Sequence, residues 1–188
     1  MTTAGLILAG GASRRMGRPK AALDYHGETF LGRLQALFLA NCNPVVVVLG
    51  HDAETVRALL DPRVREALND DPERGMLSSL QAGLQLLKEA ERVLFLPLDY
   101  PAIQPDTIAK LCATPASRIA MPRFEGRRGH PVLISQPVAH ELLALPSTGA
   151  ARDIIRSHNH EILYVDVNDP AILVDVDTPE DYQVLSRL

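Results

Sequence analysis

The residues that most clearly suggest chemistry lie in a cationic, glycine-rich stretch near the start of the chain, LILAGGASRRMGRPK, residues 6–20. Gly10 and Gly11 follow an apolar run, which predicts a buried strand ending in a tight turn, because glycine reaches positive φ without steric cost. Backbone N–H groups in such a turn bind phosphate oxygens, and neighbouring cations neutralise a polyphosphate. The cations that follow are Arg14, Arg15, Arg18 and Lys20. A solvated loop is the alternative, but this much positive charge beside a double glycine favours an anion site.

Two common phosphate-binding motifs do not match this stretch. The dinucleotide fingerprint G-x-G-x-x-G needs a spacing that Gly10, Gly11 and Gly17 do not supply. The P-loop G-x-x-x-x-G-K-[ST] needs a lysine directly after its second glycine, whereas two residues separate Gly17 from Lys20. The sequence therefore predicts a phosphate site of another kind.

A candidate metal ligand follows the apolar segment RVLFLPLDYPAI, residues 92–103. We expect Asp99 at the carboxyl end of a buried strand, with Pro97 before it and Pro101 after it. Magnesium prefers hard oxygen ligands together with substrate phosphates, and a carboxylate in this place suits it. The alternative is an aspartate that forms a turn or caps a helix.

Two more acids, Asp175 and Asp177, end a later apolar run in LVDVDTPED. If this run is a strand, the alternation of side chains sends both acids to the same face. Asp177 can instead cap the last helix, with Glu180 as its reciprocal partner. We therefore expect Asp175 to be the second metal ligand and keep Asp177 as its close rival.

The elements that must position these groups follow from apolar runs that alternate with helical patterns. Strands are expected at 6–9, 44–50, 64–68, 92–99, 162–167 and 172–176. One helix is expected to begin at residue 30, where Thr29 can cap it. Further helices are expected at 53–60, 77–89, 106–112, 138–145, 151–157 and after 177. The segments 119–122 and 131–135 suggest a hairpin or a strand inserted at the sheet edge. This order predicts a three-layer α/β/α fold with a mostly parallel sheet, whose ligands bind beyond the carboxyl ends of the strands.

Composition limits the classes of protein and partner. The chain has 188 residues, of which 46% are apolar, and we expect one domain over residues 1–188. A net charge of -4 argues against nucleic-acid or anionic-membrane binding. Cys42 and Cys112 lie far apart without CxxC spacing, so the sequence suggests neither a disulfide framework nor a zinc site, and a reducing cytoplasm fits best. No apolar run is long enough to span a membrane. His158 and His160 make a weak metal motif and are expected to be exposed to solvent.

With these residues in view, LILAGGASRRMGRPKAAL resembles the signature L-x-[AG]-G-x-S-x-R-M-G-x-x-K of the MobA-like NTP transferases, which have a Rossmann-like, GT-A-like fold. RGMLSSLQAGL, LPLDYPAI, GRRGHPVLIS, TGAARDII and DVDTPEDY are similar to later segments of the family, most of all to molybdenum cofactor cytidylyltransferases. Two features depart from that branch: Ala9-Gly10-Gly11 resembles the guanylyltransferases, and Tyr100 stands where glutamine is usual. The resemblance therefore leaves CTP, which it favours, and GTP as possible substrates.

The resemblance also implies roles for individual residues. Lys20, Arg15 and Asp99 would be catalytic, with Mg²⁺ held by Asp99 and by Asp175 or Asp177. The nucleotide would contact Leu8, Ala9, Gly10, Gly11, Ser13, Arg14, Gly75, Ser78 and Ser79. The acceptor would contact Arg127, Arg128, Gly129, His130 and Arg152. Without the family, the arginines would be ordinary surface residues, Ser78 and Ser79 a helix start, and His130 structural.

The reaction implied is Mg²⁺-dependent transfer of a nucleoside monophosphate from an NTP to a phosphate monoester, molybdopterin in this family, with release of pyrophosphate. A molybdoenzyme or its chaperone would be the protein partner. Two other functions stay open: a nucleotidyltransferase acting on a sugar phosphate or another phosphate ester, and a nucleotide-binding accessory protein without turnover. The joint presence of Lys20, Asp99 and Asp175 favours an enzyme, because binding alone needs fewer of them.

Overall fold

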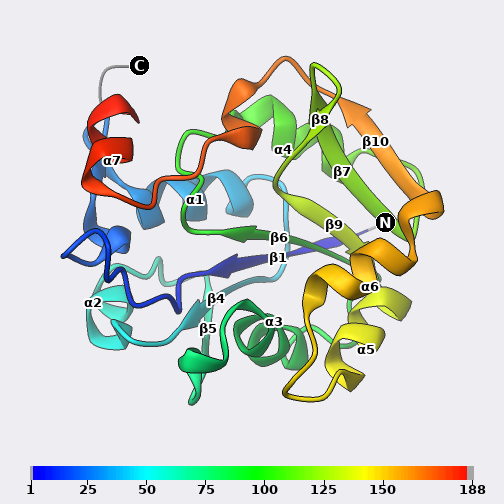
Figure 1. Cartoon of the computed structure of the whole chain (residues 1–188), viewed down its shortest axis with the longest axis horizontal. Helices are drawn as coiled ribbons and strands as arrows, with labels where there is room; N and C mark the ends of the chain where they lie inside the picture. Colours follow the sequence, from blue (N-terminus) through cyan, green and yellow to red (C-terminus); the bar gives the residue numbers. More distant parts are fainter. Residues whose placement is uncertain (1, 186–188) are drawn as a thin grey trace.

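A computed structural model describes residues 2–185 and has a central sheet between two layers of helices (Figure 1). The strands are β1 (Thr3–Leu8), β2 (Asp24–Tyr25), β3 (Glu28–Thr29), β4 (Val45–Leu49), β5 (Arg65–Leu68), β6 (Arg92–Pro97), β7 (Ile119–Phe124), β8 (Arg127–Arg128), β9 (Val132–Ser135) and β10 (Ile162–Asp166). The helices are α1 (Phe30–Leu39), α2 (Ala53–Ala58), α3 (Met76–Gln85), α4 (Pro105–Cys112), α5 (Gln136–Ala144), α6 (Ala151–Ser157) and α7 (Pro179–Leu185). This architecture confirms the predicted fold class.

The main sheet has the order β10-β7-β9-β6-β1-β4-β5, and β8 pairs with β7. The pairs β1–β4, β1–β6, β4–β5 and β7–β10 are parallel. β9 runs antiparallel to both of its neighbours, β6 and β7. The segment expected as a hairpin or at the sheet edge thus forms an antiparallel pair with β7 but lies inside the sheet, where Val132, Leu133 and Ile134 are buried.

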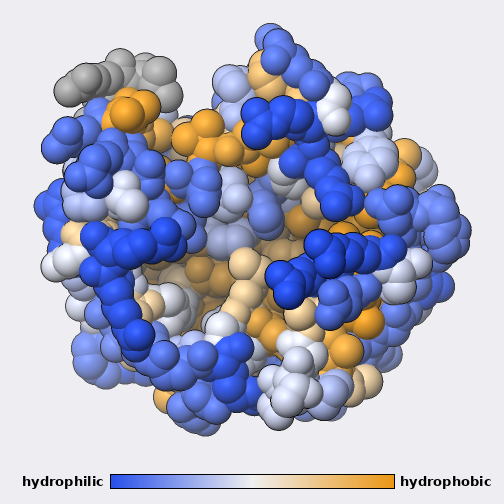
Figure 2. Space-filling view, viewed as in Figure 1, coloured by the Kyte–Doolittle hydropathy of each residue, from blue (hydrophilic) through white to orange (hydrophobic). Residues whose placement is uncertain are grey.

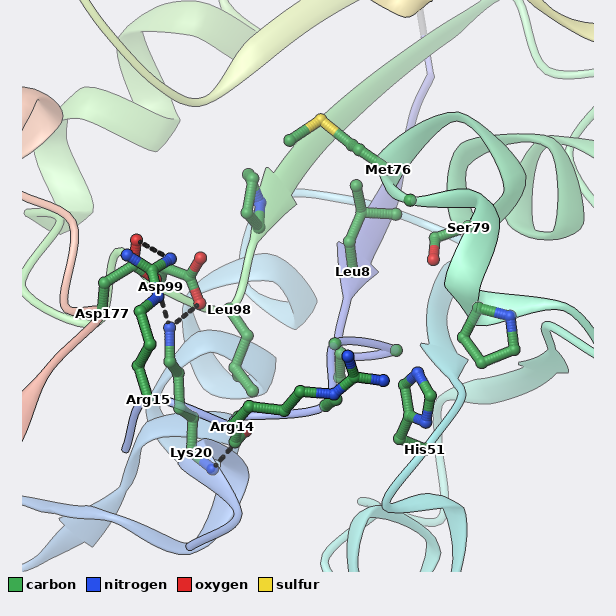
Figure 3. Close-up of a pocket in the computed structure, with 18 of the residues that line it drawn as sticks. Leu8, Arg14, Arg15, Lys20, His51, Met76, Ser79, Leu98, Asp99 and Asp177 are labelled. Carbon is green, nitrogen blue, oxygen red and sulfur yellow. Dashed lines mark hydrogen bonds and ion pairs between the residues drawn. The ribbon is translucent and has the colours of Figure 1, made fainter. Parts of the chain in front are cut away.

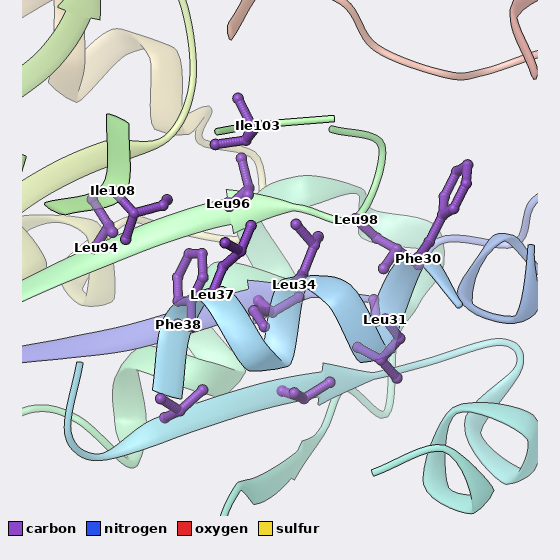
Figure 4. Packing of buried hydrophobic residues seen from close by; sticks show 14 of the residues in the cluster. Phe30, Leu31, Leu34, Leu37, Phe38, Leu94, Leu96, Leu98, Ile103 and Ile108 are labelled. Atoms are coloured by element: carbon purple, nitrogen blue, oxygen red, sulfur yellow. The ribbon is translucent and has the colours of Figure 1, made fainter. Parts of the chain in front are cut away.

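The core lies on both faces of the sheet, because every residue of β1, β4 and β6 is buried. Alternate residues of these strands face opposite helix layers. One layer contains α1 and α4, whose Phe30, Leu34, Phe38 and Ile108 pack with β6 residues such as Leu96 (Figure 4). The other layer contains α3 and α5, which pack on the opposite face. The continuous apolar strands therefore have the double burial expected of a parallel sheet.

Most expected elements are present, and α1 begins as predicted. Thr29 Oγ1 accepts a hydrogen bond of 3.0 Å from the Gly32 N–H. The expected strand at 172–176 is wrong, because Pro170–Leu173 forms a 3-10 helix, η4. Asp169 begins this turn: its carboxylate accepts from the Ala171 N–H and is also held by Thr107 Oγ1 on α4. The chain after η4 then returns to the end of β6, where the Val176 N–H donates to the Asp99 carbonyl at 2.8 Å.

Three further predictions concern cysteines, membrane spans and histidines. The thiols of Cys42 and Cys112 lie 3.9 Å apart and are not bonded covalently. Within residues 2–185, no helix combines the length and the apolar character needed to cross a membrane. His160 is exposed as expected, whereas the prediction for His158 is wrong, because only 13% of its side chain is accessible between two glutamates.

Candidate active site

A cavity of about 390 Å³ opens where the strands β1 and β6 end. This volume is in the range of small-molecule sites, which begins at about 300 Å³. It is the hollow in the middle of the face seen in Figure 2, where less polar residues form the floor and charged residues the rim. Its lining comprises Leu8, Ala9, Gly10, Gly11, Ala12, Ser13, Arg14, Arg15, Lys20, His51, Pro72, Glu73, Gly75, Met76, Ser79, Pro97, Leu98, Asp99 and Asp177. The glycine-rich stretch and both ends of the chain thus contribute to one cavity.

The turn after β1 does not use its glycines as predicted. Gly10 and Gly11 are not at positive φ, and Ser13 is, with φ 49°. Gly10 is instead in backbone contact with the loop after β4, where a Cβ on Gly50 would lie 2.3 Å from the Gly10 carbonyl oxygen. A Cβ on Gly11 would meet nothing within 4 Å, so the backbone there is open to a ligand. The glycines therefore provide close packing and open space, not a special dihedral angle.

Lys20 lies at the centre of the charged end of the cavity (Figure 3). Its Nζ donates to Asp99 Oδ1 at 3.0 Å and to Asp177 Oδ1 at 2.6 Å, and its side chain is only 9% exposed. Its backbone N–H donates to Ser13 Oγ at 3.1 Å, which ties the turn to the lysine. Residues 79 and 157 positions away in sequence thus meet on one ammonium group.

Arginines extend this charged cluster along the rim. Arg15 Nη2 donates to Asp177 Oδ2 at 2.7 Å, although the arginine side chain is mostly exposed. Arg14 pairs with Glu73 across the cavity, and His51 Nε2 lies 3.3 Å from the same carboxylate. The fourth cation of the stretch, Arg18, packs over the Tyr182 ring and does not line the cavity.

The pKa values of the two acids in the cluster, Asp99 and Asp177, are shifted in opposite directions. Burial raises the pKa of Asp99, although the Lys20 ammonium lowers it in part. The hydrogen bond from Lys20 lowers the pKa of Asp177, which Arg15 also favours in its charged form. Lys20 therefore favours the charged form of both neighbouring carboxylates.

The first turn of α7 leaves Asp177 free for this role. Asp181, not Asp177, accepts from the backbone N–H groups of Asp177 and Thr178, at 3.0 and 2.8 Å. Thr178 Oγ1 accepts in return from the Asp181 N–H at 3.2 Å. The capping role considered for Asp177, with Glu180 as its partner, is therefore wrong, because Thr178 and Asp181 form the reciprocal pair.

The donor set fits a magnesium ion that shares its ligands with a substrate. Asp99 and Asp177 offer carboxylate oxygens on one cavity wall, and no described residue hydrogen-bonds Asp99 Oδ2. Within residues 2–185 there is no cluster of three or more acidic, histidine or cysteine side chains placed to hold a metal. Two protein carboxylates with phosphate and water completing the shell is a usual magnesium arrangement. Asp175 is exposed and does not line the cavity.

The other end of the cavity is less charged and is formed by the start of α3. Gly75, at φ 82°, begins the helix, and Leu8, Met76 and Ser79 line the wall beside it (Figure 3). Ser78 is buried behind this wall and does not line the cavity itself. Of the residues predicted to bind nucleotide, the others, Ala9, Gly10, Gly11, Ser13 and Arg14, all line it.

The predicted acceptor residues lie outside this lining. His130 packs against the Tyr100 ring, with centroids 4.7 Å apart, and burial lowers the pKa of His130 to about 4. Gly129 lies against η4, where a Cβ would come within 2.1 Å of the Ile172 carbonyl oxygen. Arg127 and Arg128 are exposed on β8, and Arg152 is exposed on α6. His130 thus contacts Tyr100, the residue that follows Asp99 in the sequence.

Several lining residues were not predicted from the sequence. His51 follows β4, Pro72 and Glu73 form part of the loop after β5, and Pro97 and Leu98 precede Asp99. Their common signal is position, because each follows or ends a parallel strand whose carboxyl end faces the site.

Comparison with known proteins defines the family. The model of the MobA-like NTP transferase domain matches residues 5–162. The chain belongs to the MobA-like NTP transferase family. It is a nucleotidyltransferase related to the molybdenum cofactor cytidylyl- and guanylyltransferases.

Several curated relatives align over most of this chain. Nicotine blue oxidoreductase of Paenarthrobacter nicotinovorans is 32% identical, covering 94% of this chain and 92% of its own. Molybdenum cofactor cytidylyltransferase of Escherichia coli is 25% identical, covering 94% and 92%. Molybdenum cofactor guanylyltransferase of Xanthomonas euvesicatoria is 28% identical, covering 96% and 93%.

Among solved structures, Rv0371c of Mycobacterium tuberculosis in complex with manganese is similar to this MobA-like chain. This manganese complex is 27% identical with a TM-score of 0.81, covering 100% of this chain and 99% of its own. The Rossmann-like nucleotidyltransferase fold is thus common to both proteins.

Proposed function

We propose that this MobA-like protein transfers a nucleoside monophosphate from an NTP, with CTP favoured over GTP, to the phosphate of molybdopterin and releases pyrophosphate. The observation that carries the proposal is the meeting of Lys20, Asp99 and Asp177 beside the open backbone of Gly11. Cations and free N–H groups suit a triphosphate, and paired carboxylates suit the divalent ion that accompanies it.

A divalent cation bound by Asp99 and Asp177 would neutralise charge on the phosphates during transfer. The manganese complex of the similar mycobacterial protein supports such a site. Asp177 is a better second ligand than Asp175, because it lines the cavity and shares Lys20 with Asp99.

The chain's own residues would bind and orient the reactants. An oxygen of the acceptor phosphate forms a bond to the α-phosphorus, the bond from that phosphorus to the bridging oxygen breaks, and the electron pair leaves with pyrophosphate. Lys20 and Arg15 would stabilise the negative charge on the departing phosphates. No proton needs to be removed from an acceptor phosphate, so the reaction needs no general base, and alignment supplies much of the rate.

The choice of substrates rests on the relatives. The E. coli cytidylyltransferase aligns over 94% of the chain, which supports CTP and a molybdopterin acceptor. A guanylyltransferase aligns over a similar share, so GTP is the second substrate to test. A molybdoenzyme or its chaperone would receive the finished cofactor.

The experiment is a pyrophosphate-release assay with each of CTP, GTP, ATP and UTP, with Mg²⁺ or with EDTA. Molybdopterin and a panel of sugar 1-phosphates serve as acceptors. We expect release with CTP, molybdopterin and Mg²⁺ together, and none with EDTA. Release only with a sugar phosphate would assign another acceptor, and release in no combination would contradict transferase activity. Pyrophosphate also separates this chemistry from the oxidoreductase chemistry named for the Paenarthrobacter relative.

A further inference from the structure

A buried amide lies directly behind the less charged end of the cavity. Asn69 follows β5, is 6% exposed, and continues the sheet pairing through its N–H, which donates to the Leu49 carbonyl at 2.9 Å. Its side-chain Nδ2 donates to Ser78 Oγ at 2.9 Å and to Ser79 Oγ at 3.0 Å. One amide therefore holds two serines of α3, of which Ser79 lines the cavity.

The orientation of this amide follows from its partners. Asn69 Oδ1 accepts from the Asp71 N–H at 3.1 Å. A backbone N–H only donates, so the amide oxygen must face Asp71 and the amide nitrogen must face the serines. Both serine oxygens consequently act as acceptors toward Asn69.

The two serines differ in where their hydrogens go. Ser78 Oγ donates within the loop, to the Gly75 carbonyl at 2.8 Å or the Asp71 carbonyl at 3.0 Å. For Ser79, no described residue accepts the hydroxyl hydrogen. Ser79 Oγ also lies against the glycine turn, 3.0 Å from where a Cβ of Gly10 would be. The network thus leaves the Ser79 hydrogen available to a ligand in the cavity.

We infer that Asn69 is a positioning residue for nucleotide selectivity, which it controls by presenting Ser79 as a hydrogen-bond donor to the nucleoside. The inference rests on the proposed function, because it needs a nucleotide in this cavity. The charged cluster around Lys20 takes the triphosphate, so the nucleoside lies at the end lined by Leu8, Met76 and Ser79. The same amide holds the loop carrying Pro72, Glu73 and Gly75, which completes that wall.

Asn69→Asp tests this donor arrangement at nearly constant size. A carboxylate cannot donate, so Ser79 would turn its hydrogen toward residue 69 and present only an acceptor to the ligand. Gln35→Glu is the matched control, because Gln35 is a 2% exposed amide that donates to the Leu59 carbonyl and accepts from the Asp61 N–H, outside the cavity lining. Ser79→Ala is the second variant, which removes the hydroxyl without touching Asn69.

The measurements are KM and kcat for CTP, GTP, ATP and UTP with Mg²⁺ and molybdopterin, and the thermal shift caused by each Mg–nucleotide. Loss of one hydrogen bond predicts a KM for the preferred nucleotide about tenfold higher in Asn69→Asp and Ser79→Ala, with a smaller preference over the others and kcat within about threefold. Gln35→Glu should lower the melting temperature and leave KM and the preference unchanged.

The outcomes separate this inference from the proposed function. If the wild type neither binds nor turns over any of the four nucleotides, both fail. If the wild type is active and both site variants keep its KM and its nucleotide preference, the inference alone is overturned. If Gln35→Glu changes the preference as much as Asn69→Asp does, the effect is general destabilisation and the positioning role is wrong.

Discussion

At the residue scale, the site depends on one lysine shared by two carboxylates. Lys20 has an ammonium group within 3.0 Å of Asp99 and 2.6 Å of Asp177, in a setting where its side chain is almost wholly buried. Burial raises the pKa of Asp99, and Lys20 is the principal group opposing that rise. A buried carboxylate without its cation tends to take up a proton, which would remove the negative charge that a divalent ion needs.

Lys20→Ala is therefore expected to lower the rate of pyrophosphate release at least about 100-fold, the usual loss for one preorganised charged contact. Asp99→Ala is expected to fall as far. Lys110→Ala is the control, because Lys110 is an exposed residue of α4 that pairs with Asp106 at 2.8 Å, outside the cavity lining. Circular dichroism of each variant checks that the fold survives, and near-normal turnover in folded Lys20→Ala or Asp99→Ala would contradict their assignment.

At the element scale, a histidine joins three segments outside the cavity lining. His158, which follows α6, has its Nε2 2.7 Å from Glu141 of α5 and its Nδ1 2.9 Å from Glu161. Arg118, before β7, also pairs with Glu141 at 2.7 Å. Two carboxylates on one imidazole favour its doubly protonated form, because only that form donates from both nitrogens.

These contacts predict a pH-dependent contribution to stability. The hydrogen bonds to Glu141 and Glu161 raise the pKa of His158 above that of an unfolded histidine, about 6.5. Because the pKa of His158 is higher in the folded state, its protonated form contributes its full stabilisation below about pH 6.5. This contribution to the free energy of unfolding is lost as the pH rises through the folded-state pKa. Urea unfolding of the wild type and His158→Gln at pH 6 and pH 9 should show the larger difference at pH 6. A difference that grows toward pH 9 would contradict this charge assignment.

At the scale of the whole molecule, the sequence predicts the layers and the position of the site better than its detailed contacts. Unbroken β-branched runs such as Val45–Leu49 are typical of strands covered on both faces, so the parallel core was predictable. The turn at Pro170–Leu173 was not, because its apolar residues resemble a strand while Asp169 is held by distant partners on and before α4. The partnership of Asp177 with Lys20 likewise depends on a separation of 157 residues, which no local pattern encodes.

A ligand that draws these distant segments together should stabilise the whole molecule. The cavity joins the turn after β1, the end of β6, the start of α3 and Asp177, which precedes α7, so an Mg–nucleotide would contact parts of the chain that separate on unfolding. At a hundred times its Kd, such a ligand stabilises the native state by about 2.7 kcal/mol, and each kcal/mol raises the melting temperature of a chain of this size by about 2–4 °C. We expect the melting temperature to rise by about 5–10 °C with excess CTP and Mg²⁺, and by clearly less when EDTA replaces Mg²⁺.

The same measurement separates the two candidates for the second metal ligand. Asp177→Asn should lose the magnesium-dependent part of the shift, whereas Asp175→Asn should keep it, since Asp175 lies outside the cavity lining. The reverse result would assign the second metal ligand to Asp175.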